Sequence, residues 1–432
     1  MALGGGSFTF TNKALPGSYI NFVSTSLISG NISDRGTAAL TMPLPWGPVG
    51  ELITLTSSDF YNDSMKIFGR AYTHEELMGL RELFKYANKC YVLRAQTGGT
   101  IAECSLGKAK YEGALGNSIM ISVVASGVKY IVKTYVDGLL QDSQTVYTAG
   151  ELDGNSFVNF NASATLNETA GIYMTGGADG TVSDTIHQRF LELVESYQVN
   201  AIGCVSSDDG VKSLYADFAY TMRDVMGVKT QCVLYQYTQA DSEGVISVEN
   251  HVGDDEDNPS AVYWVTGAAA GCALNRSNTN RPYNGELDIY TDYTQAQLEE
   301  FIAEGAFVFH NASGNIRVLE DINTFTSFTN EKSADFSRNQ TIRVLDQVAM
   351  DIAGTFSRKY LGQIPNNSSG RISLWNDIVA HHRQLETVGA IEDFLSDNVA
   401  VSPGETKRSV IVTDRITPVS AMSQLYMTVV VE

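Results

Sequence analysis

Residues 171–330 alternate regularly between β-prone and helix-prone segments, and this pattern restricts the fold more than any other in the chain. Short apolar runs at 201–205 and 230–235 are typical of buried strands, whereas residues 186–197 and 214–226 place apolar side chains at helical spacing. Such alternation favours a largely parallel sheet covered by helices. Further elements of this central α/β domain are predicted at 171–174, 259–274, 287–290, 294–304, 306–310 and 316–319.

The preceding segment, residues 96–170, carries no helix signal. Its β-prone runs are separated by turn sequences such as Leu115-Gly-Asn117, which is typical of antiparallel strands joined by short turns. We therefore expect an all-β insertion that forms a small sandwich or barrel. The predicted strands of this insertion lie at 110–111, 119–124, 130–135 and 157–161.

Three more helices are predicted outside the central alternation. Residues 73–87 carry a capping box of Thr73 and Glu76, and residues 342–356 and 372–388 repeat apolar side chains at helical spacing. A second capping box, Thr294 with Gln297, opens the predicted helix at 294–304. The remaining β-prone segments near the end of the chain lie at 409–412 and 424–431.

Both ends of the sequence contain extended, apolar, β-prone segments. The last one, Leu425-Tyr-Met-Thr-Val-Val-Val431, is uncharged, and a similar segment at 19–23 follows a glycine run at 4–6. An exposed hydrophobic edge strand is a template for pairing with another chain. Each segment could pair within its own subunit, as docked termini often do, or be donated to a neighbouring subunit.

The charge balance argues against nucleic acid as a partner. The 432 residues carry a formal net charge of −20, and the Lys and Arg residues are scattered among acidic ones. Binding a phosphate backbone requires clustered positive charge. The longest uncharged apolar stretch, 261–274, is shorter than the about 20 residues that span a bilayer, so direct membrane insertion is not expected.

The five cysteines are far apart and show no C-x-x-C spacing, which favours buried free thiols over a disulfide framework or a zinc site. The first ten residues lack the basic and apolar regions of a signal peptide. Synthesis in a reducing cytoplasm is therefore expected.

No segment carries a specific catalytic, cofactor or metal motif. The turn Gly176-Gly-Ala-Asp-Gly180 is neither a dinucleotide fingerprint nor a P-loop, and the acidic run at 254–257 lacks EF-hand spacing. His381 and His382 are adjacent on a predicted helix, where His382 falls on the apolar face and is expected to be a hydrogen-bonded core residue. Ser313 lacks a nucleophile elbow. An α/β hydrolase or a small-molecule-binding enzyme that uses the 176–180 turn remains the alternative hypothesis.

Several stretches, in order along the chain, resemble the contractile phage tail sheath family. Leu15-Pro-Gly-Ser-Tyr-Ile-Asn-Phe22 is similar to the start of sheath subunits, and Tyr173-Met-Thr-Gly-Gly-Ala-Asp-Gly-Thr181 to the entry of their central domain. Tyr220-Thr-Met-Arg-Asp224 resembles the helix that follows. The likeness is strongest to the compact sheaths of Gram-positive phages, defective prophages and R-type bacteriocins. The C-terminal matches are Asn323-Thr-Phe-Thr326, Lys332-Ser-Ala-Asp-Phe336, Ile342-Arg-Val-Leu-Asp346, Gly362-Gln-Ile-Pro-Asn-Asn367 and Pro418-Val-Ser-Ala-Met422.

The resemblance implies a structural subunit, not an enzyme, with no cofactor. Subunits of this family assemble as hexameric rings stacked helically around an inner tail tube, with baseplate and tail terminator proteins as further partners. Contraction of the sheath drives the tube through a target cell envelope. The implied location is the cytoplasm of the producing bacterium during assembly, and then the tail of the released virion or bacteriocin particle.

The expected fold is therefore mixed α/β (α+β) and multidomain, with extended β arms at both ends. The predicted segments are an N-terminal arm (1–23), an α/β segment (24–95), the β insertion (96–170), the central domain (171–330), a C-terminal sheath domain (331–417) and a strand arm (418–432).

Two sets of residues acquire roles under this resemblance. The residues expected to contact neighbouring subunits through the arms are Phe8, Phe10, Tyr19, Ile20, Phe22, Leu425, Met427, Val429 and Val431. The basic residues of the final domain are expected either to face an acidic inner tube or to be solvated helix positions, and these are Lys332, Arg338, Arg343, Arg358 and Lys359.

Overall fold

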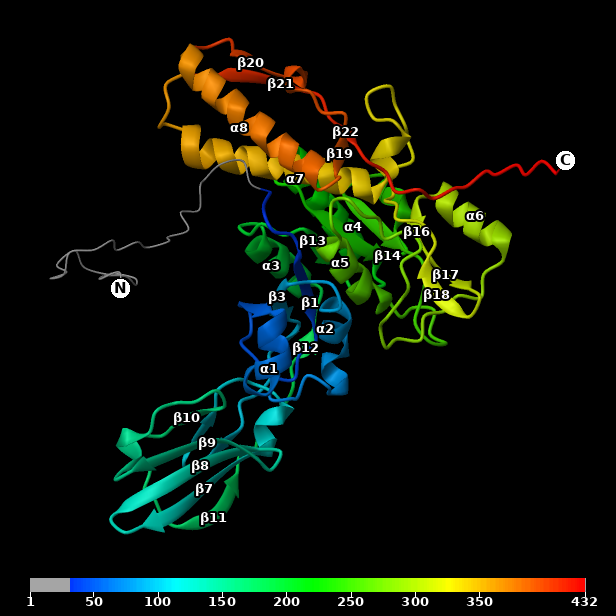
Figure 1. The fold of residues 1–432 in the computed structure, drawn as a ribbon. Helices are drawn as coiled ribbons and strands as arrows, with labels where there is room; N and C mark the ends of the chain where they lie inside the picture. Colours follow the sequence, from blue (N-terminus) through cyan, green and yellow to red (C-terminus); the bar gives the residue numbers. More distant parts are fainter. Residues whose placement is uncertain (1–31, 432) are drawn as a thin grey trace, which may run out of the picture. The chain divides into compact units, whose positions relative to one another are not determined.

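The computed structural model describes residues 32–431, which form two compact units (Figure 1). The larger, here called the sheet unit, comprises Ser33–Met350, Leu385–Phe394 and residues 416–431. The smaller, here called the helix–hairpin unit, comprises Ile32, Asp351–Gln384 and Leu395–Arg415. The mixed α/β multidomain fold predicted from the sequence is confirmed, whereas the finer division into six segments remains a prediction.

A seven-stranded sheet organises the sheet unit, in the order β16-β15-β14-β13-β1-β3-β2. All neighbouring strands run parallel except β2, which pairs antiparallel with β3. The predicted parallel sheet is therefore confirmed, and the segment before the β insertion supplies three of its strands. Its strands are β1 (Thr37–Met42), β2 (Leu52–Thr56), β3 (Lys89–Arg94), β13 (Ala201–Gly203), β14 (Gln231–Tyr235), β15 (Val245–Val248) and β16 (Ala306–Phe307).

Helices cover both faces of this sheet. Alternate residues of β1 point to opposite sides, so that Leu40 packs with the apolar side chains of α1, α2 and α5, and Ala39 packs with those of α3 and α4. The sheet is thus the middle of three layers. The helices of this unit are α1 (Ser57–Phe68), α2 (Met78–Leu83), α3 (Thr185–Val194), α4 (Asp209–Tyr220), α5 (Ala261–Gly271) and α6 (Gln295–Ala303).

Helix α5 is apolar all round because it is buried all round. Ten of its eleven residues are buried, and small side chains allow α2 to approach closely. A Cβ atom on Gly267 would lie 2.2 Å from the Leu83 carbonyl oxygen, and one on Gly271 would lie 2.0 Å from that of Tyr86. Both distances are too short for a side chain, so glycine is required at both positions.

The β insertion contains two antiparallel sheets (Figure 1). Their apolar side chains form one core, which includes Trp46. Strand β9 was not predicted from the sequence. Its leucines, Leu139 and Leu140, are adjacent and both exposed, so the strand lacks the alternation of buried and exposed side chains on which the prediction relied. The strand predicted at 171–174 to open the central domain instead pairs with β7 as the edge of the insertion. The strands are β5 (Glu103–Cys104), β6 (Gly107–Ala109), β7 (Ile119–Ser126), β8 (Lys129–Val136), β9 (Leu139–Val146), β10 (Val158–Phe160) and β11 (Thr169–Tyr173).

The capping box predicted at Thr73 and Glu76 is wrong, although the one at Thr294 is confirmed. The guanidinium of Arg81 donates to the carbonyls of Tyr72 (2.9 Å) and His74, and Glu76 accepts from Arg70 at 3.0 Å. These contacts hold the segment in a 3₁₀ turn, so α2 begins only at Met78. The strands predicted at 110–111 and 287–290 are also absent, the second reduced to a single bridge between Val252 and Ile289.

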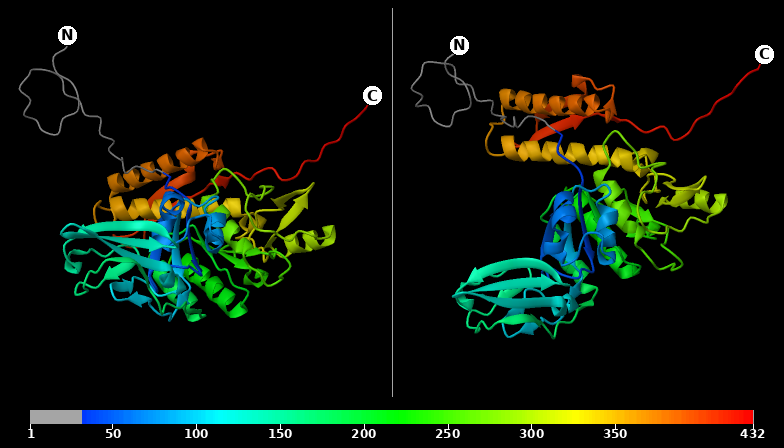
Figure 2. Two further views of the ribbon diagram at one scale, coloured as in Figure 1. Left: turned by 90° about the horizontal axis from the view of Figure 1, so that it is seen from below. Right: turned by 60° about the horizontal axis from the view of Figure 1, so that its bottom comes forward.

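The end of the chain contains two long helices and a β-hairpin. Helix α7 (Asn339–Thr355) continues into a π-helical turn at Phe356–Tyr360, and α8 (Ser368–Thr387) follows. In the helix–hairpin unit, β20 (Val399–Pro403) and β21 (Val410–Asp414) form a hairpin that lies along α8 (Figure 2). Two short antiparallel pairs belong to the sheet unit, namely β17 (Phe309–Ala312) with β18 (Asn315–Val318), and β19 (Ile391–Glu392) with β22 (Thr417–Pro418).

Candidate functional site

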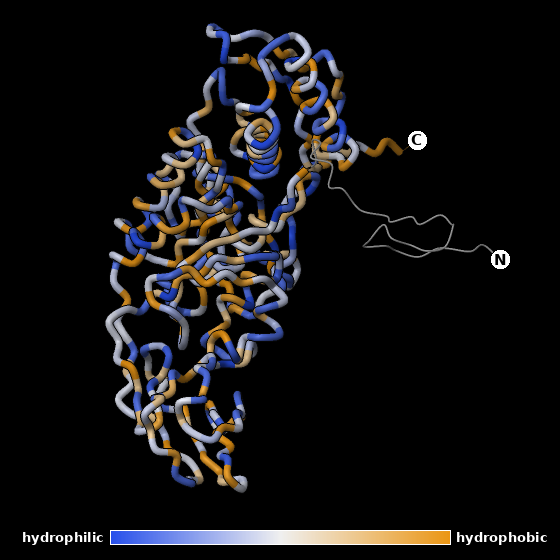
Figure 3. Tube along the Cα trace, turned by 90° about the vertical axis from the view of Figure 1, so that its left-hand side faces the viewer, coloured by the Kyte–Doolittle hydropathy of each residue, from blue (hydrophilic) through white to orange (hydrophobic). Residues whose placement is uncertain are grey.

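The C-terminal tail, residues 419–431, is an apolar segment without a strand partner among the described residues. Its beginning is held where Ala421 N–H donates to Gln340 Oε1 at 3.0 Å. Beyond that point Leu425 is 85% exposed and Val431 is 89% exposed. The tail is hydrophobic along its end in Figure 3. Pairing within its own subunit, one of the two alternatives from the sequence, is not observed for this segment.

Exposed apolar surface of this kind marks an interaction site. The four predicted contact residues of the tail, Leu425, Met427, Val429 and Val431, are all largely exposed. The five predicted N-terminal contacts, Phe8, Phe10, Tyr19, Ile20 and Phe22, lie outside the described residues.

The hairpin offers the complementary feature, an unpaired strand edge. Strands β20 and β21 pair with each other, and no other strand of the described chain pairs with either of them. The hairpin is fixed to α8 and to the loop that precedes it, because Trp375 Nε1 of α8 donates to the Val399 carbonyl at 2.9 Å and Asn366 Nδ2 of the loop donates to the Ser409 carbonyl at 2.8 Å. Ile411 on β21 is exposed. The hairpin is therefore a rigid two-stranded sheet that can accept a third strand.

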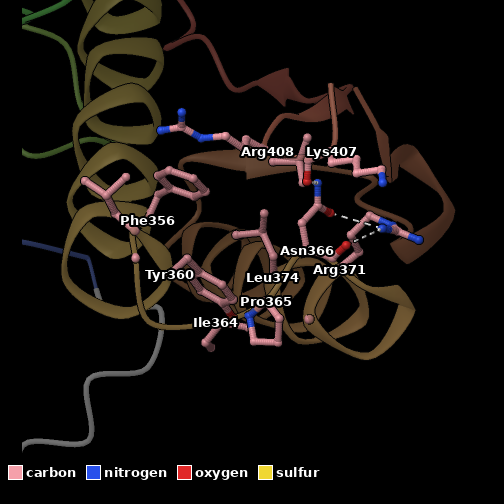
Figure 4. Close-up of a pocket in the computed structure, with 13 residues that line it drawn as sticks. Phe356, Tyr360, Ile364, Pro365, Asn366, Arg371, Leu374, Lys407 and Arg408 are labelled. Carbon is pink, nitrogen blue, oxygen red and sulfur yellow. Dashed lines mark hydrogen bonds between the residues drawn. The ribbon is translucent and has the colours of Figure 1, made fainter. Parts of the chain in front are cut away.

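A pocket of about 420 Å³ opens between the end of α7, the start of α8 and the hairpin turn (Figure 4). Its apolar wall combines aromatic and aliphatic side chains, while Arg371, Lys407 and Arg408 bring positive charge to its rim. Arg371 Nη1 donates to Asn366 Oδ1 at 3.0 Å, which orients the guanidinium beside the opening. The apolar lining residues are Phe356, Tyr360, Leu361, Ile364, Pro365, Leu374 and Val410.

The helix–hairpin unit is basic within an acidic protein. Its described residues include seven Lys and Arg against five Asp and Glu, whereas the whole chain carries a net charge of −20. Such a distribution favours an acidic partner for this unit. The adjacent pair Lys407-Arg408 was the signal in the sequence that could have drawn attention to the pocket.

Four side chains, of which Asp414 is partly exposed and the other three are buried, connect α7, α8 and β21 inside the helix–hairpin unit. His381 Nε2 lies 2.9 Å from Asp351 Oδ2, His382 Nε2 lies 2.7 Å from Asp414 Oδ2, and the two Nδ1 atoms are 3.2 Å apart. Both histidines are fully buried. The prediction that His382 is a hydrogen-bonded core residue is confirmed, and His381 shares that role. Among the described residues, no cluster of three or more His, Cys, Asp or Glu side chains is suited to hold a metal ion.

The first half of α7 buries charged side chains where an apolar face was predicted. Arg343 Nη2 lies 2.7 Å from Asp321 Oδ2, and Arg223 contacts Asp346 at 2.7 and 2.8 Å. Burial by itself would raise the pKa of the Asp321 carboxyl, but the Arg343 guanidinium and hydrogen bonds from Asn278 and Asn339 together hold that pKa below its ordinary value. These ion pairs attach α7 to the sheet unit.

The assignment of Arg343 as an inner-tube contact is therefore corrected. Its side chain is 1% exposed and bonded to Asp321, so it belongs to the core and presents no surface to a partner. Of the other four residues in that set, Arg358 is exposed and Lys332 lies 2.7 Å from Glu243 at the surface. Arg338 pairs with Glu320, and Lys359 lies 2.7 Å from Asp377.

The 176–180 turn does not form an anion cradle. Gly177 N–H donates to Asn117 Oδ1 at 2.9 Å, and Ala178 N–H donates to the Thr100 carbonyl at 3.3 Å. A Cβ atom on Gly180 would lie 2.2 Å from the Thr97 carbonyl oxygen, so this turn packs tightly against the preceding segment. Its glycines serve close backbone packing, and helix α3 begins further along the chain at Thr185.

Comparison with known proteins places these features in a family. Family models match residues 35–95 (tail sheath protein Gp18 domain III, N-terminal region), 180–324 (phage tail sheath protein central domain) and 331–432 (phage tail sheath C-terminal domain). The phage-like element PBSX protein XkdK of Bacillus subtilis (strain 168) is 30% identical over 467 residues, which cover 99% of each chain.

Solved structures agree with these matches. The sheath tail protein from Desulfitobacterium hafniense superposes with a TM-score of 0.79 at 32% identity, covering 94% of this chain and 98% of that one. The helical sheath of the anti-feeding prophage in its contracted state shares the fold at 13% identity, with a TM-score of 0.58 over 97% of this chain and 99% of that one.

The three-layer sheet unit with its β insertion, the helix–hairpin unit and the apolar tail together define a structural subunit of a phage or prophage tail. The chain belongs to the phage tail sheath protein family. The family predicted from the sequence motifs is thereby confirmed, as is a structural rather than an enzymatic role. No helix of the described residues is long and apolar enough to cross a membrane.

Proposed function

We propose that this subunit polymerises as hexameric rings stacked helically around an inner tail tube, between baseplate and tail terminator proteins, and that contraction drives the tube through a target envelope. The observation that carries this proposal is the combination, in one chain, of an exposed apolar tail and a hairpin with open edges. A donor segment and an acceptor edge on the same molecule generate an open polymer when the contact does not close on itself. The fold shared with a contracted helical sheath supports the proposal.

The tail acts as a donated strand in this arrangement. An extended segment rises about 3.3 Å per residue, so the eight residues 424–431 span about 25 Å. These eight residues are enough to pair along the whole of either hairpin strand, each of which has five residues. Main-chain hydrogen bonds then supply affinity, and side chains that alternate between the two faces supply specificity.

A flexible link of this kind can persist while the rigid units reorient. The main interface between sheet units can therefore exchange one packing for another during contraction without dissociation of the array. No nucleotide or other cofactor takes part in this scheme. Synthesis in the cytoplasm of the producing bacterium and release in the tail of a particle complete the proposal.

Electron microscopy of the purified chain, alone and coexpressed with its inner tube protein, tests polymerisation directly. We expect hollow tubes with six-fold end views in at least one preparation, because donor and acceptor are present in every subunit. A monodisperse monomer in both preparations would contradict the proposal that this chain polymerises.

The exposed basic residues are expected to bind the inner tube. Charge reversal at two of them, Lys332→Glu with Arg358→Glu, should leave sheath polymers intact but release the inner tube protein from the pelleted polymer, since an acidic tube would then meet like charge. Co-sedimentation at increasing salt is the measurement. Lys66→Glu on α1, whose side chain is 68% exposed, is the matched control and should retain the tube. Retention of the tube protein by the double variant would show that Lys332 and Arg358 do not bind the inner tube.

A further inference from the structure

We propose that the pocket of the helix–hairpin unit is a seat for the Tyr426 side chain from the tail of a second copy of this chain. The inference rests on the proposed donation of tails between subunits and names the place where the donated segment is anchored. The pocket and the tail belong to different parts of the sequence, and nothing in the described structure occupies the pocket.

The pocket is built next to a strand edge. Val410 begins β21 and also lines the pocket, and Lys407 and Arg408 come from the turn that precedes it (Figure 4). A strand added beside β21 would therefore run past the pocket opening. Because successive side chains of a strand point to opposite faces, every second residue of the added strand could enter the pocket.

The chemistry of the pocket fits a tyrosine. Phe356 and Tyr360 are stacked with ring centroids 6.2 Å apart and an interplanar angle of 11°, and they present aromatic surface beside Leu374. At the rim, Arg371 and Arg408 offer cations to a ring face and donors to a phenol oxygen. An aromatic body with a polar tip matches an apolar wall with a polar rim.

The tail supplies one such residue. Tyr426 is the only aromatic residue of the tail, it is 88% exposed, and apolar residues lie on both sides of it in sequence. A volume of about 420 Å³ accommodates the ring and part of a neighbouring side chain. Burial of one large aromatic anchor in a preformed pocket is the usual pattern of an interface hot spot.

Disulfide trapping tests the seat in the assembled protein. Leu361, 61% exposed at the pocket wall, is changed to cysteine in one preparation. Thr428, which is two residues from the proposed anchor and therefore on the same face of an extended strand, is changed to cysteine in a second preparation that carries a size tag. Mixed assembly and mild oxidation should yield a covalent heterodimer. The native thiols are buried except the half-buried Cys104, so each variant with one added cysteine, oxidised alone, gives the background.

The matched control is Ile372→Cys, which is 59% exposed in the same unit but does not line the pocket, and it should not form the heterodimer. A second measurement uses the anchor itself. Tyr426→Ala should raise the protein concentration needed for polymerisation at least about tenfold. Tyr426→Phe should retain most of the assembly, because the ring stays, and Val430→Ala should change it little.

The outcomes separate this inference from the proposed function. If tubes form and require the tail, but Leu361→Cys is not trapped by Thr428→Cys, the tail binds elsewhere and only the seat is wrong. Trapping by Phe10→Cys in place of Thr428→Cys would assign the pocket to the N-terminal segment. A further variant carries both added cysteines in one chain. If a disulfide formed within single copies of this variant and none formed between copies, the pocket would bind the subunit's own tail. Tubes that form without the tail would contradict both the donated strand and its seat, while polymerisation itself would stand.

Discussion

Removal of residues 423–432 is expected to abolish tube formation and leave a folded, soluble subunit. The tail beyond Ala421 contributes no buried residue to its own chain within the described structure, so its loss should not change the free energy of unfolding. In the assembly the same segment is expected to link neighbouring copies. Sedimentation velocity and electron microscopy measure the loss of polymer, and the thermal unfolding midpoint measures the retained fold.

A control variant separates the tail from exposed apolar surface in general. Val128 and Leu139 in the β insertion are 81% and 59% exposed, and their replacement by serine removes exposed apolar surface elsewhere on the subunit. We expect this double variant to form tubes as the parent does. Tubes assembled from the truncated chain would falsify the role of the tail, and failure of both variants would show that assembly depends on exposed apolar surface without regard to position.

Arg343→Met is expected to destabilise the sheet unit by about 3–5 kcal/mol, because it leaves the Asp321 carboxylate buried without its cation. Asp321 is 2% exposed and also accepts hydrogen bonds from Asn278 N–H at 2.8 Å and Asn339 Nδ2 at 3.0 Å. These neutral donors do not replace a full positive charge in a buried site. Urea unfolding followed by tryptophan fluorescence measures the loss, since Trp46 and Trp264 are both buried in the sheet unit.

Two comparisons make this second prediction specific. Arg338→Met removes the partner of Glu320 at a site where the arginine side chain is 44% exposed, and should lower stability by less than about 1 kcal/mol. Adding Asp321→Asn to Arg343→Met should recover a substantial part of the loss, because no uncompensated charge then remains. A small effect of Arg343→Met alone would contradict the structural role assigned to this ion pair.

Local sequence patterns were sufficient to predict those helices and strands whose buried side chains recur with a single regular spacing. The capping box at Thr294, the antiparallel strands β7 and β8, and the apolar runs of β13 and β14 agree with the predictions. In these segments burial and intrinsic preference favour the same structure, so the pattern is visible without knowledge of the neighbours. The ordered motifs were likewise sufficient to identify the family.

Segments held by distant residues could not be predicted in this way. The helix expected from Thr73 is shortened because Arg70 binds the Glu76 carboxylate that its cap would need, and Arg81 binds the carbonyls of Tyr72 and His74. On α7, Arg343 and Asp346 are buried because their partners Asp321 and Arg223 arrive from other elements, the latter 123 positions away in sequence. From the sequence alone a charged residue is predicted to be exposed to solvent, because charged residues are rarely buried without a partner.

The sequence by itself determined the family, through motifs that resemble it in order along the chain. It also determined the parallel sheet with its β insertion and the apolar character of the tail, because these depend on composition and periodicity within a short window. Only the tertiary structure decided that the tail stays without a partner strand in its own subunit, that Arg343 lies in the core, and that residues from α8 and the hairpin turn enclose a pocket. These features depend on side chains far apart in sequence, and their contacts exist only once the chain has folded.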